Sequence, residues 1–85
     1  MVSNRHGNTV EVDIHGMTTE QARRELEQFL SRISGNVTEL VVIHGYNGGQ
    51  ALLKMVRTQL KHPRIGSKLL TLNSGQTRLI LKPKQ

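Results

Sequence analysis

The chain of 85 residues contains no cysteine, and its aromatic residues are limited to Phe29 and Tyr46. Without cysteine it can form neither a disulfide nor a thiolate metal site, so nothing in it requires an oxidising compartment. We therefore expect a cytoplasmic protein whose core is built from Leu, Ile, Val, Met and Ala. Two aromatic side chains do not make a platform on which successive bases could stack.

Long apolar runs are also missing, because the longest one covers residues 40–43, whereas a membrane-spanning helix needs roughly 20 apolar residues. The first residues of the chain contain no apolar signal segment, so we expect neither a leader nor membrane insertion. No repeat or linker divides the sequence. We expect a monomer with one domain over residues 9–82, a flexible N-terminus over residues 1–8 and a tail over residues 83–85.

Negative charge is absent from the second half of the chain. Residues 41–85 carry eight Lys and Arg residues and no Asp or Glu, whereas residues 1–40 carry four Arg residues against six acids. A half-chain of this kind projects a positive field that favours phosphate-bearing partners, and nucleic acid is the first candidate. The alternative is a solvated basic face that keeps a small domain soluble.

The spacing of apolar residues predicts six elements in the order βαβαββ, an α/β fold with a four-stranded mixed sheet and two helices. Thr18 and Gln21 form a capping-box pattern at the start of the first helix, and Pro63 ends the second helix. Asn73-Ser74-Gly75 suits a hairpin turn between the last two strands. The predicted strands cover residues 10–15, 40–43, 68–72 and 76–82, and the helices about residues 18–35 and 51–60.

The two strands that precede helices should pair in parallel, so their C-terminal ends should share one edge of the sheet. This arrangement brings Asp13, His15 and His44 together, and we predict them as catalytic residues. Histidine transfers protons near neutral pH, and Asp13 could orient an imidazole or hold Mg²⁺ or Mn²⁺. The alternative stays open, because a single histidine at a strand end is more often structural than catalytic.

The glycine-rich run of residues 44–49 opens the second helix and resembles a phosphate cradle, in which backbone N–H groups face an anion. It lacks the Gly-Lys-Ser/Thr ending of a nucleotide-hydrolysing P-loop. The alternative is a plain turn that needs positive φ. Together with the basic residues, the run gives these candidates for nucleic-acid contact: Gly45, Tyr46, Asn47, Gly48, Gly49, Lys54, Arg57, Lys61, Arg64, Lys68 and Arg78.

Three motifs in this order resemble an Smr (small MutS-related) domain. The first is Val12-Asp13-Ile14-His15-Gly16, which matches the family's Leu-Asp-Leu-His-Gly with conservative changes. The second begins at His44-Gly45 and ends at Gly49, with Asn47 where the family's His-Gly-x-Gly-x-Gly has its middle glycine. The third is Asn73-Ser74-Gly75-Gln76-Thr77, where the family usually has Asn-Gly-Gly-x-Thr. The resemblance covers about residues 9–82.

This resemblance implies a two-layer α+β sandwich similar to the C-terminal domain of a bacterial translation initiation factor. It also implies nucleic-acid binding and, as in several members, an endonuclease that nicks DNA or cleaves RNA. Our leading hypothesis is therefore a phosphodiesterase acting on DNA or RNA, assisted by a metal or based on histidine. The alternatives are a nucleic-acid or ribosome binding module that does not cleave, and an adaptor that binds proteins.

Overall fold

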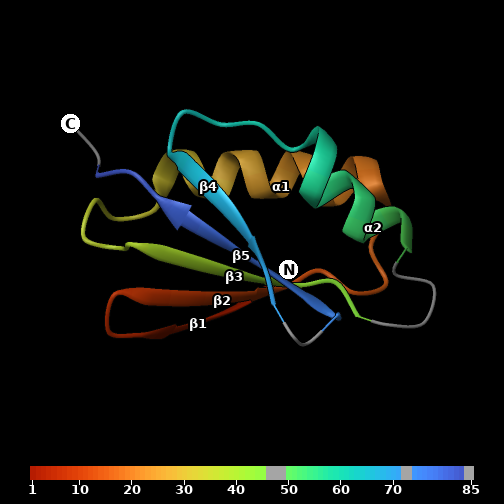
Figure 1. The fold of residues 1–85 in the computed structure, drawn as a ribbon, viewed down its shortest axis with the longest axis horizontal. Coiled ribbons are helices and arrows are strands. Elements are labelled where there is room, and N and C mark those ends of the chain that lie inside the picture. The colour runs from red at the N-terminus through yellow and green to blue at the C-terminus, as the bar shows by residue number, and fades with distance from the viewer. Residues whose placement is uncertain (46–49, 72–73, 84–85) are drawn as a thin grey trace.

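The computed structural model describes residues 1–45, 50–71 and 74–83, which form a mixed sheet and two helical segments (Figure 1). The sheet has five strands in the spatial order β1-β2-β3-β5-β4. The elements along the chain are β1 (Val2–His6), β2 (Thr9–Asp13), α1 (Thr19–Arg32), β3 (Glu39–Ile43), α2 (Gln50–Lys54), the π-helical turn η1 (Met55–Gln59), β4 (Ile65–Leu70) and β5 (Gln76–Leu81).

The predicted parallel pair is present at the centre of the sheet. Strand β2 runs parallel to β3, with Asp13 opposite Ile43, and α1 connects the two strands. All other pairs are antiparallel, including the predicted hairpin of β4 and β5. The hairpin residue Asn73 lies outside the described residues. The topology therefore places the C-terminal ends of β2 and β3 side by side, as the sequence predicted.

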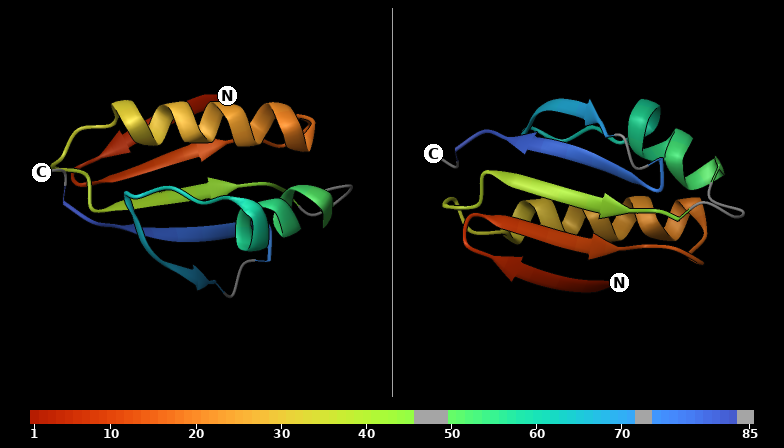
Figure 2. Two further views of the ribbon diagram at one scale, coloured as in Figure 1. Left: turned by 90° about the horizontal axis from the view of Figure 1, so that it is seen from above. Right: turned by 60° about the horizontal axis from the view of Figure 1, so that its bottom comes forward.

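Both helices lie on one face of the sheet, which gives two layers (Figures 1 and 2). Thr18 caps α1 by accepting a hydrogen bond from the Gln21 N–H at 3.1 Å. Alternate residues of the strands point at the helices, and the core lies between these layers. It contains Val10, Val12, Ile14, Leu40, Val42, Leu79 and Leu81 from the sheet side and Ala22, Leu26, Leu30, Leu52, Met55, Val56 and Leu60 from the helical side.

The sheet has a fifth strand, β1, where we expected four strands and a flexible N-terminus over residues 1–8. All five of its residues are exposed, so it has no apolar alternation for a sequence pattern to detect. It pairs with β2 through a two-residue turn in which Gly7 has φ 62°. Glycine at the first position of a two-residue hairpin turn is typical of type II′. The signal available in the sequence was therefore the Gly7-Asn8 dipeptide.

The predicted second helix changes its hydrogen-bonding pattern half-way. After α2 it continues as the π-turn η1, in which the Leu60 N–H donates to the Met55 carbonyl at 2.8 Å. Such π-turns are uncommon and often occur at functional sites. Apolar spacing does not forecast this widening, because Met55, Val56 and Leu60 remain buried in either form. Within the described ranges, neither helix has the length and apolar character needed to cross a membrane.

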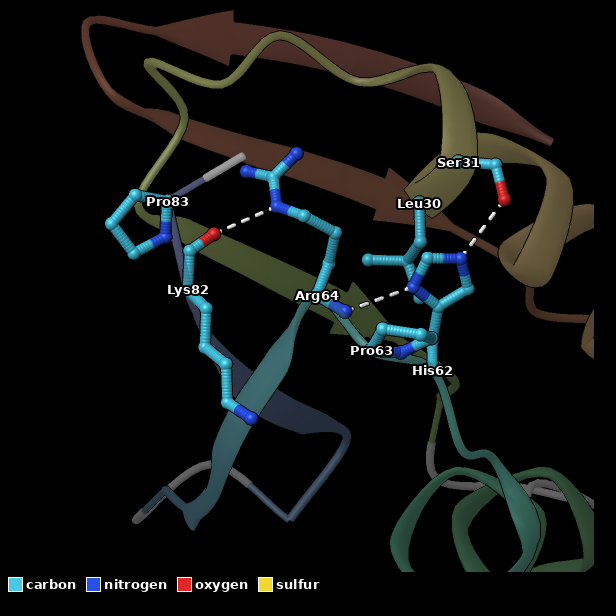
Figure 3. A pocket seen from close by; sticks show the side chains of 7 residues that line it. All are labelled: Leu30, Ser31, His62, Pro63, Arg64, Lys82 and Pro83. Atoms are coloured by element: carbon cyan, nitrogen blue, oxygen red, sulfur yellow. Dashed lines mark hydrogen bonds between the residues drawn. The ribbon is translucent and has the colours of Figure 1, made fainter. Parts of the chain in front are cut away.

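The end of the sheet far from His44 and Gly45 is held by Arg64, which is 7% exposed. Its Nε donates to the Lys82 carbonyl at 2.7 Å, a contact visible in Figure 3. Its terminal nitrogens donate to the carbonyls of Ile33 and Val37 at 3.1 Å and of Ser34 at 3.3 Å. One guanidinium thus joins the α1–β3 connection to the end of β5.

We expect Arg64→Met to lower the free energy of unfolding by about 2–4 kcal/mol, because it leaves buried carbonyls without their charged donor. Urea unfolding followed by circular dichroism measures this change. Arg23→Met is the matched control, since Arg23 is exposed on α1 and surface substitutions usually change stability by less than about 0.5 kcal/mol. Equal losses in the two variants would contradict the structural role of Arg64.

Candidate functional site

The first and second motifs meet where β2 and β3 end. The Ile14 N–H donates to the Ile43 carbonyl at 2.9 Å, which continues the parallel pairing beyond β2. Gly45 has φ 84°, and a Cβ added to it would lie 3.4 Å from the Cβ of His15. The turn that leaves β3 therefore passes directly beside the His15 side chain, as expected for two parallel strands that end at one edge.

Asp13 and His15 form a hydrogen-bonded pair at this edge. The Asp13 Oδ1 lies 2.5 Å from the His15 Nδ1 and accepts a second hydrogen bond from the His15 backbone N–H at 3.0 Å. Burial raises the pKa of Asp13, but these hydrogen bonds and the nearby imidazole outweigh it, so the pKa lies below its usual value. The side chain of His15 is 70% exposed. The carboxylate thus orients the ring and leaves its Nε2 accessible to solvent.

His44 lies at the same end of the sheet but its side chain points to the opposite face. Strand residues alternate between faces, and His44 shares the buried face with Leu40 and Val42, whereas Asp13 and His15 share the other face. His44 is 1% exposed. The expectation that the three side chains gather in one site is therefore wrong: the strand ends meet, but the pleat separates His44 from the pair.

The His44 ring is held by the third motif. Its Nε2 lies 3.0 Å from the Thr77 Oγ1, and the same oxygen accepts a hydrogen bond from the Arg57 Nε at 3.0 Å. Burial lowers the pKa of His44, and the guanidinium of Arg57 lowers it further, while the carbonyls of Gly45 and Gln76 offset part of this effect. The net effect is a lowered pKa, which favours the neutral form of His44. Thr77 was quoted as part of a motif but not predicted as a site residue.

The third motif also forms backbone hydrogen bonds with the first residues of the glycine-rich run. The N–H groups of His44 and Gly45 both donate to the carbonyl of Gly75, at 2.9 and 3.1 Å. The N–H of Gly45 is therefore engaged inside the protein and does not face an anion, which corrects its predicted role in a phosphate cradle. The other predicted members of the cradle, residues 46–49, lie outside the described residues.

The comparisons with known proteins agree with the three motifs. The model of the Smr domain family matches residues 12–77, well over half of the chain. The chain belongs to the Smr domain family. Among solved structures it is similar to the Smr domain of Thermus thermophilus MutS2, with a TM-score of 0.67 and 27% sequence identity over 86% of this chain and 98% of that chain. A search of curated proteins found no match.

Of the cations predicted to contact nucleic acid, three are bound within this Smr domain. Arg64 is buried, as described above, so the prediction that it contacts nucleic acid is wrong. Lys68 donates from Nζ to the carbonyls of Val56 and Leu60 at 2.8 and 2.6 Å. Arg78 forms a bidentate ion pair with Glu39, in which two guanidinium nitrogens each lie 2.6 Å from a carboxylate oxygen. Their charges serve the domain's own structure.

Lys54 in α2, Arg57 in η1 and Lys61 just after η1 remain available. Lys54 and Lys61 are exposed, and their ammonium groups have no partner in the part of the chain that the structure describes. Arg57 is half-buried and donates to the Thr77 hydroxyl and to the Gln76 carbonyl, which leaves N–H groups without a partner among the described residues. The predicted basic surface is therefore narrower than the sequence suggested and follows α2, η1 and the residues just after them.

The described residues of this site offer few ligands for a divalent metal ion. Across residues 1–45, 50–71 and 74–83, no group of three or more His, Cys, Asp or Glu side chains is arranged to hold a metal ion. Near the candidate site, the Asp13 carboxylate offers one oxygen to a cation, since its Oδ1 already binds His15. The donor set fits a Mg²⁺ ion only if substrate oxygens and waters supply the remaining ligands.

A pocket of about 720 Å³ lies at the opposite end of the sheet and contains a serine beside a histidine (Figure 3). The Ser31 Oγ is 2.9 Å from the His62 Nε2, but the backbone N–H of Arg64 donates to the His62 Nδ1 at 3.0 Å. In a neutral ring the proton is then on Nε2 and points at Ser31. His62 therefore cannot take a proton from Ser31, and this pair is structural.

We expect the free energy of unfolding to fall as the pH is lowered from about 8 to 5, and more steeply in the wild type than in His44→Gln. The pKa of His44 is depressed in the folded state, so the unfolded state takes up a proton first, below about 6.5, and stability is lost as the pH falls. Urea unfolding at a series of pH values measures this. Because the other histidines are common to both proteins, parallel curves would contradict the assignment.

Proposed function

We propose that this Smr domain binds nucleic acid and cleaves its phosphodiester bonds, with His15 as the proton-transfer group and Asp13 as the residue that orients it. The observation that supports this proposal is the exposed Asp13–His15 pair beside the Gly45 turn. A carboxylate that accepts a hydrogen bond from the Nδ1–H keeps that proton on Nδ1, so in the neutral ring the Nε2 lone pair is free to act as a base. Gly45, which lies beside His15, is followed along the chain by α2 and its basic residues, and we infer that these residues bind the phosphate groups.

In this proposal the imidazole takes a proton from the attacking hydroxyl, either of water or of a ribose, as the new bond to phosphorus forms. The resulting imidazolium is stabilised by Asp13, and the proton can then pass to the leaving oxygen. A bound Mg²⁺ or Mn²⁺ would neutralise charge on the phosphate. His44 contributes as a neutral positioning residue, because its ring is buried against Thr77 on the other face of the sheet.

The second candidate function is a nucleic-acid or ribosome binding module that does not cleave. One observation favours it: the second and third motifs hold each other through His44, Gly45, Gly75 and Thr77. These residues therefore have a structural role whether or not the domain is an enzyme. Under this alternative the Asp13–His15 pair contributes to binding, and the basic helical segment supplies most of the affinity.

We expect His15→Ala to reduce cleavage of labelled DNA or RNA by roughly 10²-fold or more, while affinity changes by a few-fold at most, because general acid–base catalysis typically contributes this much. Asp13→Asn should reduce the rate as well, since the amide cannot stabilise an imidazolium. The assays are run with and without Mg²⁺ or Mn²⁺. His6→Ala is the control, because His6 is an exposed histidine at the other end of the β1–β2 hairpin. Absence of wild-type cleavage under every metal condition would favour the binding module.

We expect binding to duplex DNA to depend on salt with a log–log slope near −2.7, which corresponds to about three phosphate contacts at −0.9 each. The contacts are assigned to Lys54, Arg57 and Lys61, since Arg64, Lys68 and Arg78 are engaged within the domain. Fluorescence anisotropy at several salt concentrations measures the slope. A slope near zero would contradict an electrostatic interface, and a much steeper one would require the engaged cations to be released.

A further inference from the structure

A second, smaller hollow is lined by residues of η1, of β4 and of the connection between them. It has a volume of about 350 Å³, and its lining includes Arg57, Lys61 and Lys68 above an apolar floor of Leu60 and Ile65. None of the described residues that line it is an acid. Three basic residues therefore line one small hollow, with no carboxylate among its described lining residues.

Lys68 neutralises backbone carbonyls that would otherwise repel an anion in this hollow. The carbonyls at the end of a helical segment carry partial negative charge, which would repel a phosphate. The ammonium of Lys68 lies against two of these carbonyls, those of Val56 and Leu60, and so cancels that charge. Burial lowers the pKa of Lys68, and the positive charge of Lys61 lowers it further. The cations around the hollow thus repel each other, and a bound anion would relieve this repulsion.

The guanidinium of Arg57 is held in one orientation by residues of β5. Its Nε is held by the Thr77 Oγ1 at 3.0 Å and one terminal nitrogen by the Gln76 carbonyl at 3.3 Å, so the plane of the guanidinium is set by β5. The N–H groups that these contacts do not use belong to a rigid fork that matches phosphate oxygens. A guanidinium whose orientation is already determined loses little rotational freedom when it binds.

We propose that the hollow between η1 and β4 is a phosphate-binding subsite, in which Arg57 and Lys61 bind one backbone phosphate of the nucleic acid. The proposal rests on the proposed nucleic-acid binding and names where one phosphate is held. Through Thr77, the same guanidinium is joined to His44 and to the turn that follows β3. An occupied subsite would therefore help to fix the nucleic-acid strand relative to the sheet edge that carries Asp13 and His15.

Inorganic phosphate, titrated at constant ionic strength, is the first probe. We expect saturable changes in the NMR signals of the Arg57 Nε–H and the Lys61 amide in the wild type and in Arg23→Gln. We expect these changes to disappear in Lys61→Gln. The two variants lose the same charge from exposed side chains, so a difference between them reports the site and not the net charge. Absence of saturable changes in the wild type, or their persistence in Lys61→Gln, would overturn the subsite.

Single-stranded DNA is the second probe, and it distinguishes a nucleic-acid phosphate from a free one. We expect Lys61→Gln to weaken binding several-fold and to reduce the magnitude of the log–log salt slope by about 0.7, the value for one phosphate contact on a single strand. Arg23→Gln should leave the slope unchanged. Equal slopes in the two variants would overturn the subsite while leaving the wider interface intact. Phosphate binding without any DNA binding would instead contradict the proposed function and assign the subsite to a free anion.

Discussion

The interlock between the end of β3 and the start of β5 is the constraint on which the candidate site depends. The Gly75 carbonyl accepts hydrogen bonds from two successive N–H groups, and the Thr77 hydroxyl joins the His44 ring to Arg57. These contacts fix the path of the chain as it leaves β3, and that path places Gly45 against His15. The exposed Asp13–His15 pair and the helical cations are thereby held in a constant relation to one another.

Much of the fold followed from the sequence, because it depends on patterns that side chains repeat. Period-two alternation identified β2, helical spacing identified α1, and the order of strands and helices required a parallel pair of β2 and β3. The three motifs identified the family, which the family model confirmed. Strand β1 was missed because its stability comes from backbone hydrogen bonds to β2, and such bonds leave no apolar pattern in an exposed strand.

The site was predicted less completely, for two physical reasons. The sequence showed that Asp13, His15 and His44 come to one edge, but which face a strand-end residue occupies depends on the exact register, and there His44 differs from the pair. A count of cations also does not show which of them the protein uses internally. Arg64 lies between backbone segments far apart in the sequence, and Lys68 lies against a helix end. Both contacts exist only after folding.

The position of the Asp13–His15 pair makes the first motif sensitive to chain length. Side chains in a strand change face at every residue, so inserting or deleting one residue within β2 would turn the whole motif over. Ile14 would then face solvent, and the Asp13 carboxylate would be directed into the core between Val42 and the helices. Length variation among related domains is therefore compatible with this pair only outside β2, for example in the connection from α1 to β3.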